Sequence, residues 1–493
     1  MPAFARSASV PLLAMALLAG CGPRDSQTMH VIVVERDAAL PAANDRRLAI
    51  PAAMLRAATA EGLVAFDADG RVVPAMADRW IVTDGGLSYI FRLRDGTWAD
   101  GTPVTGETVR NALRAAIAQQ GSSPLAADLS PLQEIRAMAG RVIEIRLATP
   151  MPDLLTLLAQ PELGLMHHGK GEGPMAQRPL NGGVELTMIP PARRGLPASD
   201  DWAASVRPLT FATMPGARAL AAFVAGQADV VVGGGFADLP RVQHVSLPAG
   251  ALRFDQASGL FGLLVVRATG FLAAAQNREA LALAVDRDSL TAALGATGWL
   301  PTTRIVTPGL PGDPGIVAER WSDIALDGRR ELASRRVSDW VQSGAGPLVL
   351  TIALPVGPGA DILFDRLAND FAMVGITLHR AAPGAVPDLR VIDALARYPR
   401  AEWFLDRLSC AALAGPCSPD ADTLTTQART TADPAQAALI RVQAENALAA
   451  SNVFVPFGPP VRWSLVRGAP AGFAVNRLGF HPLPPLAQRA TAL

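Results

Sequence analysis

Cysteine, tyrosine and lysine are scarce in this sequence of 493 residues, which contains 3 Cys and 2 Tyr. Lys170 is the only lysine, so arginine carries nearly all of the positive charge. The 44 basic residues are balanced by 44 acidic residues. A chain without net positive charge lacks the basic face that holds nucleic-acid phosphates, so we expect no nucleic-acid partner.

The motifs of common enzymes are also missing. The sequence has no G-x-S-x-G nucleophile elbow and no H-E-x-x-H zinc motif. Residues 164–171 come close to a phosphate-binding loop, but Gly171 stands where Ser or Thr should hold Mg²⁺, so we interpret the match as chance. His167 and His168 offer two metal ligands with no third ligand in view, a pattern more typical of a plain surface. We therefore predict no metal, no cofactor and no enzymatic activity.

The beginning of the chain predicts export. Leu12 to Gly20 form an apolar run that is shorter than the roughly 20 residues needed to span a bilayer, so it is typical of a secretory signal. Small residues just before Cys21 resemble a lipobox, in which cleavage leaves the cysteine as a lipid-bearing N-terminus. The alternative is an ordinary signal peptide that happens to contain Cys21. No other segment is long and apolar enough to be a transmembrane helix.

Only Cys410 and Cys417 remain for a disulfide. Export places them in an oxidising compartment, and Gly415 and Pro416 supply a bend between them. We expect a disulfide bond in preference to two free thiols. No histidine lies near enough in the sequence to make this pair a metal site.

Residues 61–109 have the pattern of short strands separated by tight turns. Within them Tyr89, Phe91 and Leu93 alternate with a second set of residues, which is the two-residue period of a β-strand. Asp-Gly pairs mark the turns, because glycine accepts the positive φ that such turns require. These pairs stand at residues 69–70, 84–85, 95–96 and 100–101.

Taken in order, these motifs resemble the signature of the bacterial family 5 extracellular solute-binding proteins, the peptide, dipeptide and nickel receptors of ABC importers. The segments that carry the resemblance are Glu61-Gly62-Leu63-Val64, Pro74-Ala75-Met76-Ala77-Asp78-Arg79-Trp80, Tyr89-Ile90-Phe91-Arg92-Leu93-Arg94, Asp100-Gly101-Thr102-Pro103 and Glu107-Thr108-Val109. Looser matches follow at residues 171–175, 226–232, 278–288, 298–302 and 455–457. The resemblance thus covers nearly the whole chain after the signal.

The resemblance implies an α/β, two-lobed periplasmic-binding-protein-like fold with an extra inserted subdomain and a ligand cleft between the lobes. The length agrees, because 493 residues are too many for one core. Strand, helix and strand patterns in order between residues 348 and 378 also support an α/β domain. The expected ranges are 1–20 for the signal peptide, 21–48, 166–258 and 455–493 for lobe I, 49–165 for the inserted subdomain and 259–454 for lobe II.

The sequence departs from the family at the segment that usually captures a peptide's ammonium group with a carboxylate. In residues 396–405 the acids are replaced by Arg397 and Arg400. Either arginine faces the cleft and binds a carboxylate or phosphate through its guanidinium group, or both are solvated loop residues. Asp393 and Glu402 stand nearby as substitute acids.

Three further residues are candidates for the site. Arg267 stands where the family often has Asn after a strand, so it lines the cleft or caps the strand end. Trp299 and Trp403 pack on a ligand or belong to the core or rim. We expect an extracytoplasmic binding protein without enzymatic activity, which delivers a peptide-like or anionic solute to an ABC permease and its ATPase.

Several properties accompany this expectation. The protein is predicted to be a periplasmic monomer that is held to a membrane by the lipid on Cys21 alone. The alternative is a protein of the same fold that has lost transport and acts as a ligand sensor or as a structural or interaction protein of the envelope.

Overall fold

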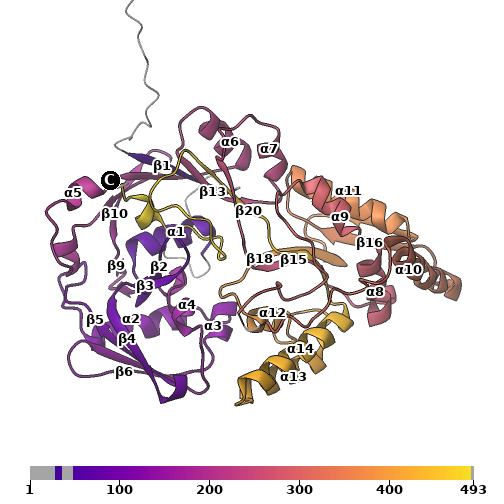
Figure 1. The fold of residues 1–493 in the computed structure, drawn as a ribbon, viewed down its shortest axis with the longest axis horizontal. Helices are drawn as coiled ribbons and strands as arrows, with labels where there is room; N and C mark the ends of the chain where they lie inside the picture. The colour runs from indigo at the N-terminus through magenta and orange to yellow at the C-terminus, as the bar shows by residue number, and fades with distance from the viewer. Residues whose placement is uncertain (1–27, 36–47, 312, 490–493) are drawn as a thin grey trace, which may run out of the picture.

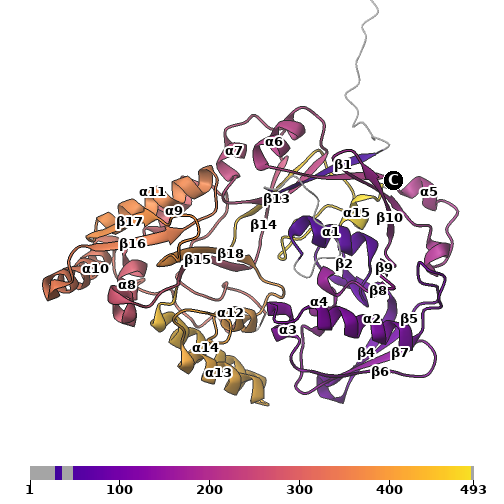
Figure 2. The same ribbon diagram turned by 180° about the vertical axis from the view of Figure 1, so that it is seen from behind.

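The structure is a computed structural model that describes residues 28–35, 48–311 and 313–489. It is a mixed α/β protein whose two largest sheets, of seven and five strands, form two lobes (Figures 1 and 2). A separate four-stranded sheet lies at the end of the seven-stranded lobe (Figure 1). The signal segment and Cys21 lie outside the described residues.

The seven-stranded sheet of lobe I is built around the buried strand β1 (Met29–Val34). Its β-branched residues suit a strand with neighbours on both sides. Ile32 packs in the core cluster that contains helix α6 (Gly216–Val224), whereas Val31 and Val33 pack in the cluster that contains helices α1 (Ile50–Thr59) and α15 (Leu483–Leu486). Alternate residues of β1 thus join opposite faces of the sheet to its helices.

The strands of this sheet run in the order β10-β11-β12-β1-β13-β20-β14. Strands β12 and β13 are both parallel to β1. Although the predicted inserted subdomain begins at residue 49, helix α1 packs on the lobe I sheet. The other strands of this sheet are β10 (Met175–Leu180), β11 (Gly183–Met188), β12 (Leu209–Met214), β13 (Val230–Gly235), β14 (Leu252–Asp255) and β20 (Arg462–Val466), and the chain also forms the helices α5 (Trp202–Ser205) and α7 (Leu239–Gln243). Two separate two-stranded sheets are formed by β2 (Val64–Phe66) with β3 (Val72–Pro74) and by β8 (Met166–His167) with β9 (Lys170–Gly171).

The inserted subdomain is the antiparallel sheet β4-β5-β7-β6 with helices α2, α3 and α4. Apolar residues at helical spacing after Val109 predict a helix from residue 109. The helix begins earlier, at Gly106, because Thr105 and Thr108 form a reciprocal capping box at its start. The alternation of apolar and charged residues in 142–147 predicts a strand, and the structure confirms it as Val142–Leu147. The bounds are β4 (Ala77–Thr83), β5 (Ser88–Leu93), β6 (Leu132–Ala137), β7 (Val142–Leu147), α2 (Gly106–Gln119), α3 (Pro124–Asp128) and α4 (Leu154–Leu158).

Lobe II contains the five-stranded sheet β17-β16-β18-β15-β19. Strand β16 (Leu348–Ala353), helix α11 (Pro358–Ala372) and strand β17 (Ile376–Arg380) form a parallel unit, which confirms the strand–helix–strand pattern. Helices α12, α13 and α14 lie beside the inserted subdomain (Figures 1 and 2). The remaining bounds are β15 (Gly259–Val265), β18 (Leu389–Leu395), β19 (Phe454–Gly458), α8 (Ala275–Ala284), α9 (Arg287–Leu294), α10 (Leu326–Trp340), α12 (Ala401–Arg407), α13 (Pro419–Thr430) and α14 (Pro434–Ser451).

The chain crosses between the two large sheets at two short connections, residues 256–258 and 459–461. Strand β19 pairs with β15, so residues 455–458 share the sheet of lobe II rather than that of lobe I. Two adjacent connections of this kind are typical of domains that move about a hinge. Among the described residues, none of the helices has the length and apolar character needed to cross a membrane.

Candidate ligand site between the lobes

A pocket of about 480 Å³ lies where the two lobes meet. Lobe I contributes residues 235–237, at the carboxyl end of β13, and lobe II contributes residues 353–355, at the carboxyl end of β16. Arg390, Val391 and Asp393 of β18 complete the lining. Ligands of open α/β sheets bind in the crevice outside the carboxyl ends of strands, so this position is suited to a small solute.

The two lobes touch at one rim of this pocket. The backbone N–H of Gly359 donates a hydrogen bond of 2.8 Å to the carbonyl oxygen of Ala237. A Cβ atom on Gly359 would lie 1.9 Å from the carbonyl oxygen of Phe236, so only glycine permits this approach. The first turn of α11 is therefore held directly against lobe I.

The charged groups of the pocket differ in how they are paired. Asp393 of lobe II accepts hydrogen bonds of 2.8 and 3.0 Å from one guanidinium nitrogen of Arg462, on lobe I strand β20. Arg390 is exposed between the buried neighbours Leu389 and Val391, and its register partner on β16 is Ala353. Among the described residues no hydrogen bond or ion pair engages its side chain. The pocket thus offers one available cation among mostly apolar walls.

Arg397 and Arg400 lie elsewhere, at the contact between lobe II and the inserted subdomain. The Nε atom of Arg400 is 2.6 Å from Oδ2 of Asp153, at the start of α4. Arg397 is 3.9 Å from Asp128 and 3.8 Å from Glu162. Neither arginine lines the interlobe pocket. Their role in binding a ligand stays a prediction, and the structure gives each an acidic neighbour within the protein.

Burial changes the acid–base properties of these partners. Removal from water raises the pKa of Asp128 to about 7, against the opposing effect of Arg397. Its Oδ2 atom is buried without a hydrogen-bond partner. Burial also raises the pKa of Asp153, while Arg400 opposes that rise. At the contact between lobe II and the inserted subdomain, ionisation of these carboxyl groups therefore costs free energy.

The other predicted site residues are engaged in structural contacts. The Nε1–H of Trp299 donates a 2.7 Å hydrogen bond to the carbonyl oxygen of Pro459, on a connection between the lobes. Trp403 is buried and packs edge-on against Phe404. Arg267 forms a 2.6 Å ion pair with Asp388. None of these side chains lines the interlobe pocket, so their ligand roles remain predictions.

Glu402, the other candidate acid, lies 3.0 Å from Arg441. Cys410 and Cys417 form a disulfide bond in the structure, with Cα atoms 5.0 Å apart. Of the residues singled out from the sequence as ligand contacts, Asp393 is the one that lines the pocket.

The sequence reasoning did not identify Arg390 or residues 235–237. The available signal for Arg390 was the pattern of residues 389–391, where an arginine stands between two apolar residues at the beginning of a strand. Residues 235–237 follow a buried parallel strand, and the carboxyl ends of such strands border ligand sites. Neither signal shows by itself that these two segments meet in space.

Residues 71–378 match the family described as bacterial extracellular solute-binding proteins, family 5, middle region. The chain belongs to this family. The match spans more than half of the 493 residues and starts within the motifs that carry the resemblance in the sequence. The family consists of solute-binding proteins rather than enzymes.

Individual relatives agree with the family. The chain is 36% identical over 127 residues to the probable deoxycholate-binding periplasmic protein YgiS of Escherichia coli (strain K12). That alignment covers 22% of this chain and 24% of the relative, so it spans about a quarter of the length of YgiS.

Solved structures of the family have the same fold over nearly the whole chain. Haemophilus influenzae OppA, in complex with the peptide RPPGFSPFR, superposes with a TM-score of 0.78 at 18% identity, covering 94% of this chain and 100% of that chain. The Escherichia coli murein tripeptide binding protein MppA also has a TM-score of 0.78 at 18% identity, covering 94% and 98%. These likenesses confirm the two-lobed periplasmic-binding-protein fold.

Proposed function

We propose that this protein is the extracytoplasmic binding component of an ABC import system and that its interlobe pocket captures a small solute with an anionic group. The observation that carries the proposal is Arg390, an available guanidinium group at the edge of a mostly apolar pocket between the lobes. Guanidinium groups bind carboxylates and phosphates through two parallel hydrogen bonds.

The pocket supports a ligand with an apolar body as well as an anion. Phe236, Leu354, Pro355 and Val391 supply apolar lining, and the volume of about 480 Å³ falls in the range of small-molecule sites. A short peptide or a peptide-like acid has this combination of groups. The peptide named with H. influenzae OppA supports the peptide-like class for this protein as well.

Closure of the two lobes over the solute would present a distinct surface to the permease, whose ATPase drives import. The protein is proposed to work as a periplasmic monomer, tethered by a lipid on Cys21. Radiolabelled palmitate is then expected to label the wild type but not Cys21→Ala. Equal labelling of the two proteins would contradict the lipid anchor while leaving the solute-binding proposal untouched.

The solute-binding proposal is tested by thermal shift with peptides, opines, phosphonates and nickel complexes. A ligand that binds only the folded state raises the melting temperature by mass action. We expect an anionic compound to stabilise the wild type and Arg366→Ala but not Arg390→Ala. Arg366 is a matched control, because it is an exposed arginine on α11 of the same lobe.

Two outcomes would reject the proposal. Stabilisation that is equal in Arg390→Ala and the wild type would remove the assigned anion contact. No stabilisation by any compound would favour the alternative of a family-fold protein that has lost transport and serves as a sensor or an interaction protein.

A further inference from the structure

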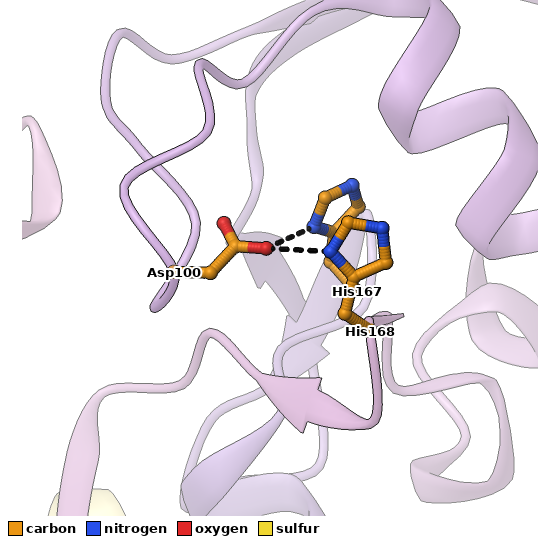
Figure 3. A group of neighbouring side chains, drawn as sticks. All are labelled: Asp100, His167 and His168. Atoms are coloured by element: carbon orange, nitrogen blue, oxygen red, sulfur yellow. Dashed lines mark hydrogen bonds and ion pairs between the residues drawn. The ribbon is translucent and has the colours of Figure 1, made fainter.

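A cluster of three potential metal ligands lies apart from the interlobe pocket. Figure 3 shows Asp100, His167 and His168 with their polar atoms directed toward one another. The Oδ2 atom of Asp100 is 2.9 Å from Nδ1 of His167 and 2.8 Å from Nδ1 of His168. Two segments far apart in the sequence therefore meet at a single carboxylate oxygen.

The histidines are presented by the hairpin β8–β9. Its register pairs His167 with Lys170, which leaves His168 and Gly169 as a two-residue turn. Both turn residues have positive φ, 49° and 76°, as a tight hairpin turn of this type requires. Histidine is among the residues that tolerate this conformation better than most. The turn thus holds the imidazole rings of His167 and His168 next to each other, with their centroids 4.1 Å apart.

Asp100 is fixed by its own turn. The N–H of Gly101 bonds to the carbonyl oxygen of Trp98 at 2.8 Å, and the N–H of Trp98 bonds to the carbonyl oxygen of Thr102 at 2.7 Å. The N–H of Thr102 also donates to Oδ1 of Asp100 at 2.9 Å, which leaves Oδ2 for the histidines.

The surroundings support the ligands and leave room for an ion to enter. The ring of His167 stacks on the buried Trp98 at 5.0 Å with an interplanar angle of 18°. The side chain of His168 is 76% exposed, whereas those of His167 and Asp100 are 15% and 21% exposed. A cavity of about 1140 Å³ begins beside the cluster, since Trp98, Gly101 and Gly169 line it. Fixed outer contacts of this kind orient metal ligands.

We propose that Asp100, His167 and His168 form a binding site for a divalent transition cation such as Zn²⁺. Two imidazoles and one carboxylate are a donor set that suits Zn²⁺, Co²⁺, Ni²⁺ or Cu²⁺ rather than Mg²⁺. With three protein ligands, a tetrahedral ion would keep one position open for water or for a further ligand.

The donor atoms need only a small movement to hold an ion. Metal–ligand bonds of about 2.0–2.1 Å place tetrahedral donors about 3.3 Å apart, somewhat farther than the present Nδ1–Oδ2 separations. Rotation of the exposed His168 ring widens its separation from Asp100, and the separation between His167 and Asp100 needs to grow by only about 0.4 Å. Each histidine would carry its proton on Nε2 and present the Nδ1 lone pair to the ion.

The prediction of no metal from the sequence depended on the absence of a third ligand near the two histidines. Asp100 supplies that ligand from a turn that is remote in the sequence but adjacent in space. The proposed site shares no residue with the interlobe pocket, so the two proposals can fail separately.

The test is calorimetric titration of Zn²⁺ into the metal-free full chain without a histidine tag, repeated with Co²⁺ to follow the visible absorption of a tetrahedral site. The variants are Asp100→Asn, which keeps the shape of the side chain, and His168→Ala, which removes an exposed ring. His244→Ala is the matched control, because His244 is an exposed histidine outside the cluster.

We expect saturable binding of one Zn²⁺ per chain, weakened at least about tenfold in Asp100→Asn and in His168→Ala and unchanged in His244→Ala. Mg²⁺ should not compete. The proposal is overturned if Zn²⁺ binding is not saturable, or if both variants bind as the wild type does. Loss of Zn²⁺ binding in Asp393→Asn would also overturn it, because Asp393 is the carboxylate that lines the interlobe pocket and the ion would then be bound there.

Discussion

Two arginine-containing regions of lobe II face other parts of the protein, and they differ in how their charge is used. At the contact with the inserted subdomain, Arg397 and Arg400 have the acids Asp128, Glu162 and Asp153 as neighbours. At the interlobe pocket, Arg390 has no ion-pair partner among the described residues. The same residue type therefore stabilises an internal contact in one place and remains available to a ligand in the other.

The difference follows from the cost of removing charge from water. A guanidinium group that already has a carboxylate neighbour gains little from a second anion, and breaking its pair leaves a partly buried carboxylate uncompensated. An unpaired guanidinium group beside apolar walls gains a full charge-assisted interaction when an anion arrives. Pairing within the protein thus decides which arginine is available for binding.

Reversing the charge at the pocket gives the largest expected effect. Arg390→Glu should lower the affinity for an anionic ligand by about 2–4 kcal/mol, because a favourable charge contact is replaced by repulsion. Isothermal titration calorimetry would measure the change, with Arg366→Glu as the control. An unchanged affinity would mean that Arg390 does not contact the ligand, and the comparison between the two regions would then fail.

Removing the buried acid Asp128, at the contact between lobe II and the inserted subdomain, should change the pH dependence of the free energy of unfolding. The pKa of Asp128 in the folded protein is about 7, above the value of about 3.9 for an unfolded aspartate. The folded state therefore holds this proton more tightly. The resulting contribution to the free energy of unfolding is present below about pH 4 and is lost as the pH rises through about 7.

Asp128→Asn removes this loss, so the advantage in stability of the variant over the wild type should grow by about 2–3 kcal/mol between pH 5 and pH 8. Denaturant unfolding at the two pH values would measure it. Asp365→Asn, an exposed substitution on α11, is the control. Parallel pH profiles for the wild type and Asp128→Asn would show that Asp128 is ionised throughout this range.

A smaller effect is expected from Arg400→Glu. It replaces the 2.6 Å ion pair with Asp153 by two facing carboxylates, which should lower the free energy of unfolding by about 1–2 kcal/mol at these partly exposed positions. The double variant with Asp153→Arg should recover most of the loss. If Arg400 instead binds the ligand, which is one of the two alternatives left open by the sequence, the affinity for the anion should be abolished and Asp153→Arg should not restore it.

The smallest effect concerns the acid of the pocket itself. Asp393→Asn should release Arg462 from its pair across the lobes and make the pocket more positive. An anionic ligand should then bind about threefold more tightly, equivalent to less than 1 kcal/mol. Weaker binding would indicate instead that Asp393 contacts the ligand directly, in the role proposed from the sequence.

Much of the fold could be predicted because its signals are local. The strand at residues 142–147 and the strand–helix–strand unit between residues 348 and 378 appear in the periodicity of the sequence itself. The start of α2 was misplaced by a few residues, because a threonine capping box extended the helix beyond its apolar pattern. The ordered motifs of residues 61–109 were sufficient to suggest the family.

The candidate site was less accessible to sequence reasoning. Arg397 and Arg400 attracted interest because they replace acids of a family motif, yet their charged partners come from a different part of the chain. The adjacent histidines lacked a third ligand only because Asp100 belongs to another turn. In each case the decisive neighbour is distant in sequence.

The sequence by itself determined the family, the strands and turns of residues 61–109 and the strand–helix–strand unit of residues 348–378, because these depend on side-chain periodicity and on backbone preferences within a few residues. Only the tertiary structure decided which arginines are paired, which one is available at the pocket and which carboxylate meets the two histidines. Ion pairing and metal coordination depend on separations of a few ångströms in space, and only folding brings these remote segments together.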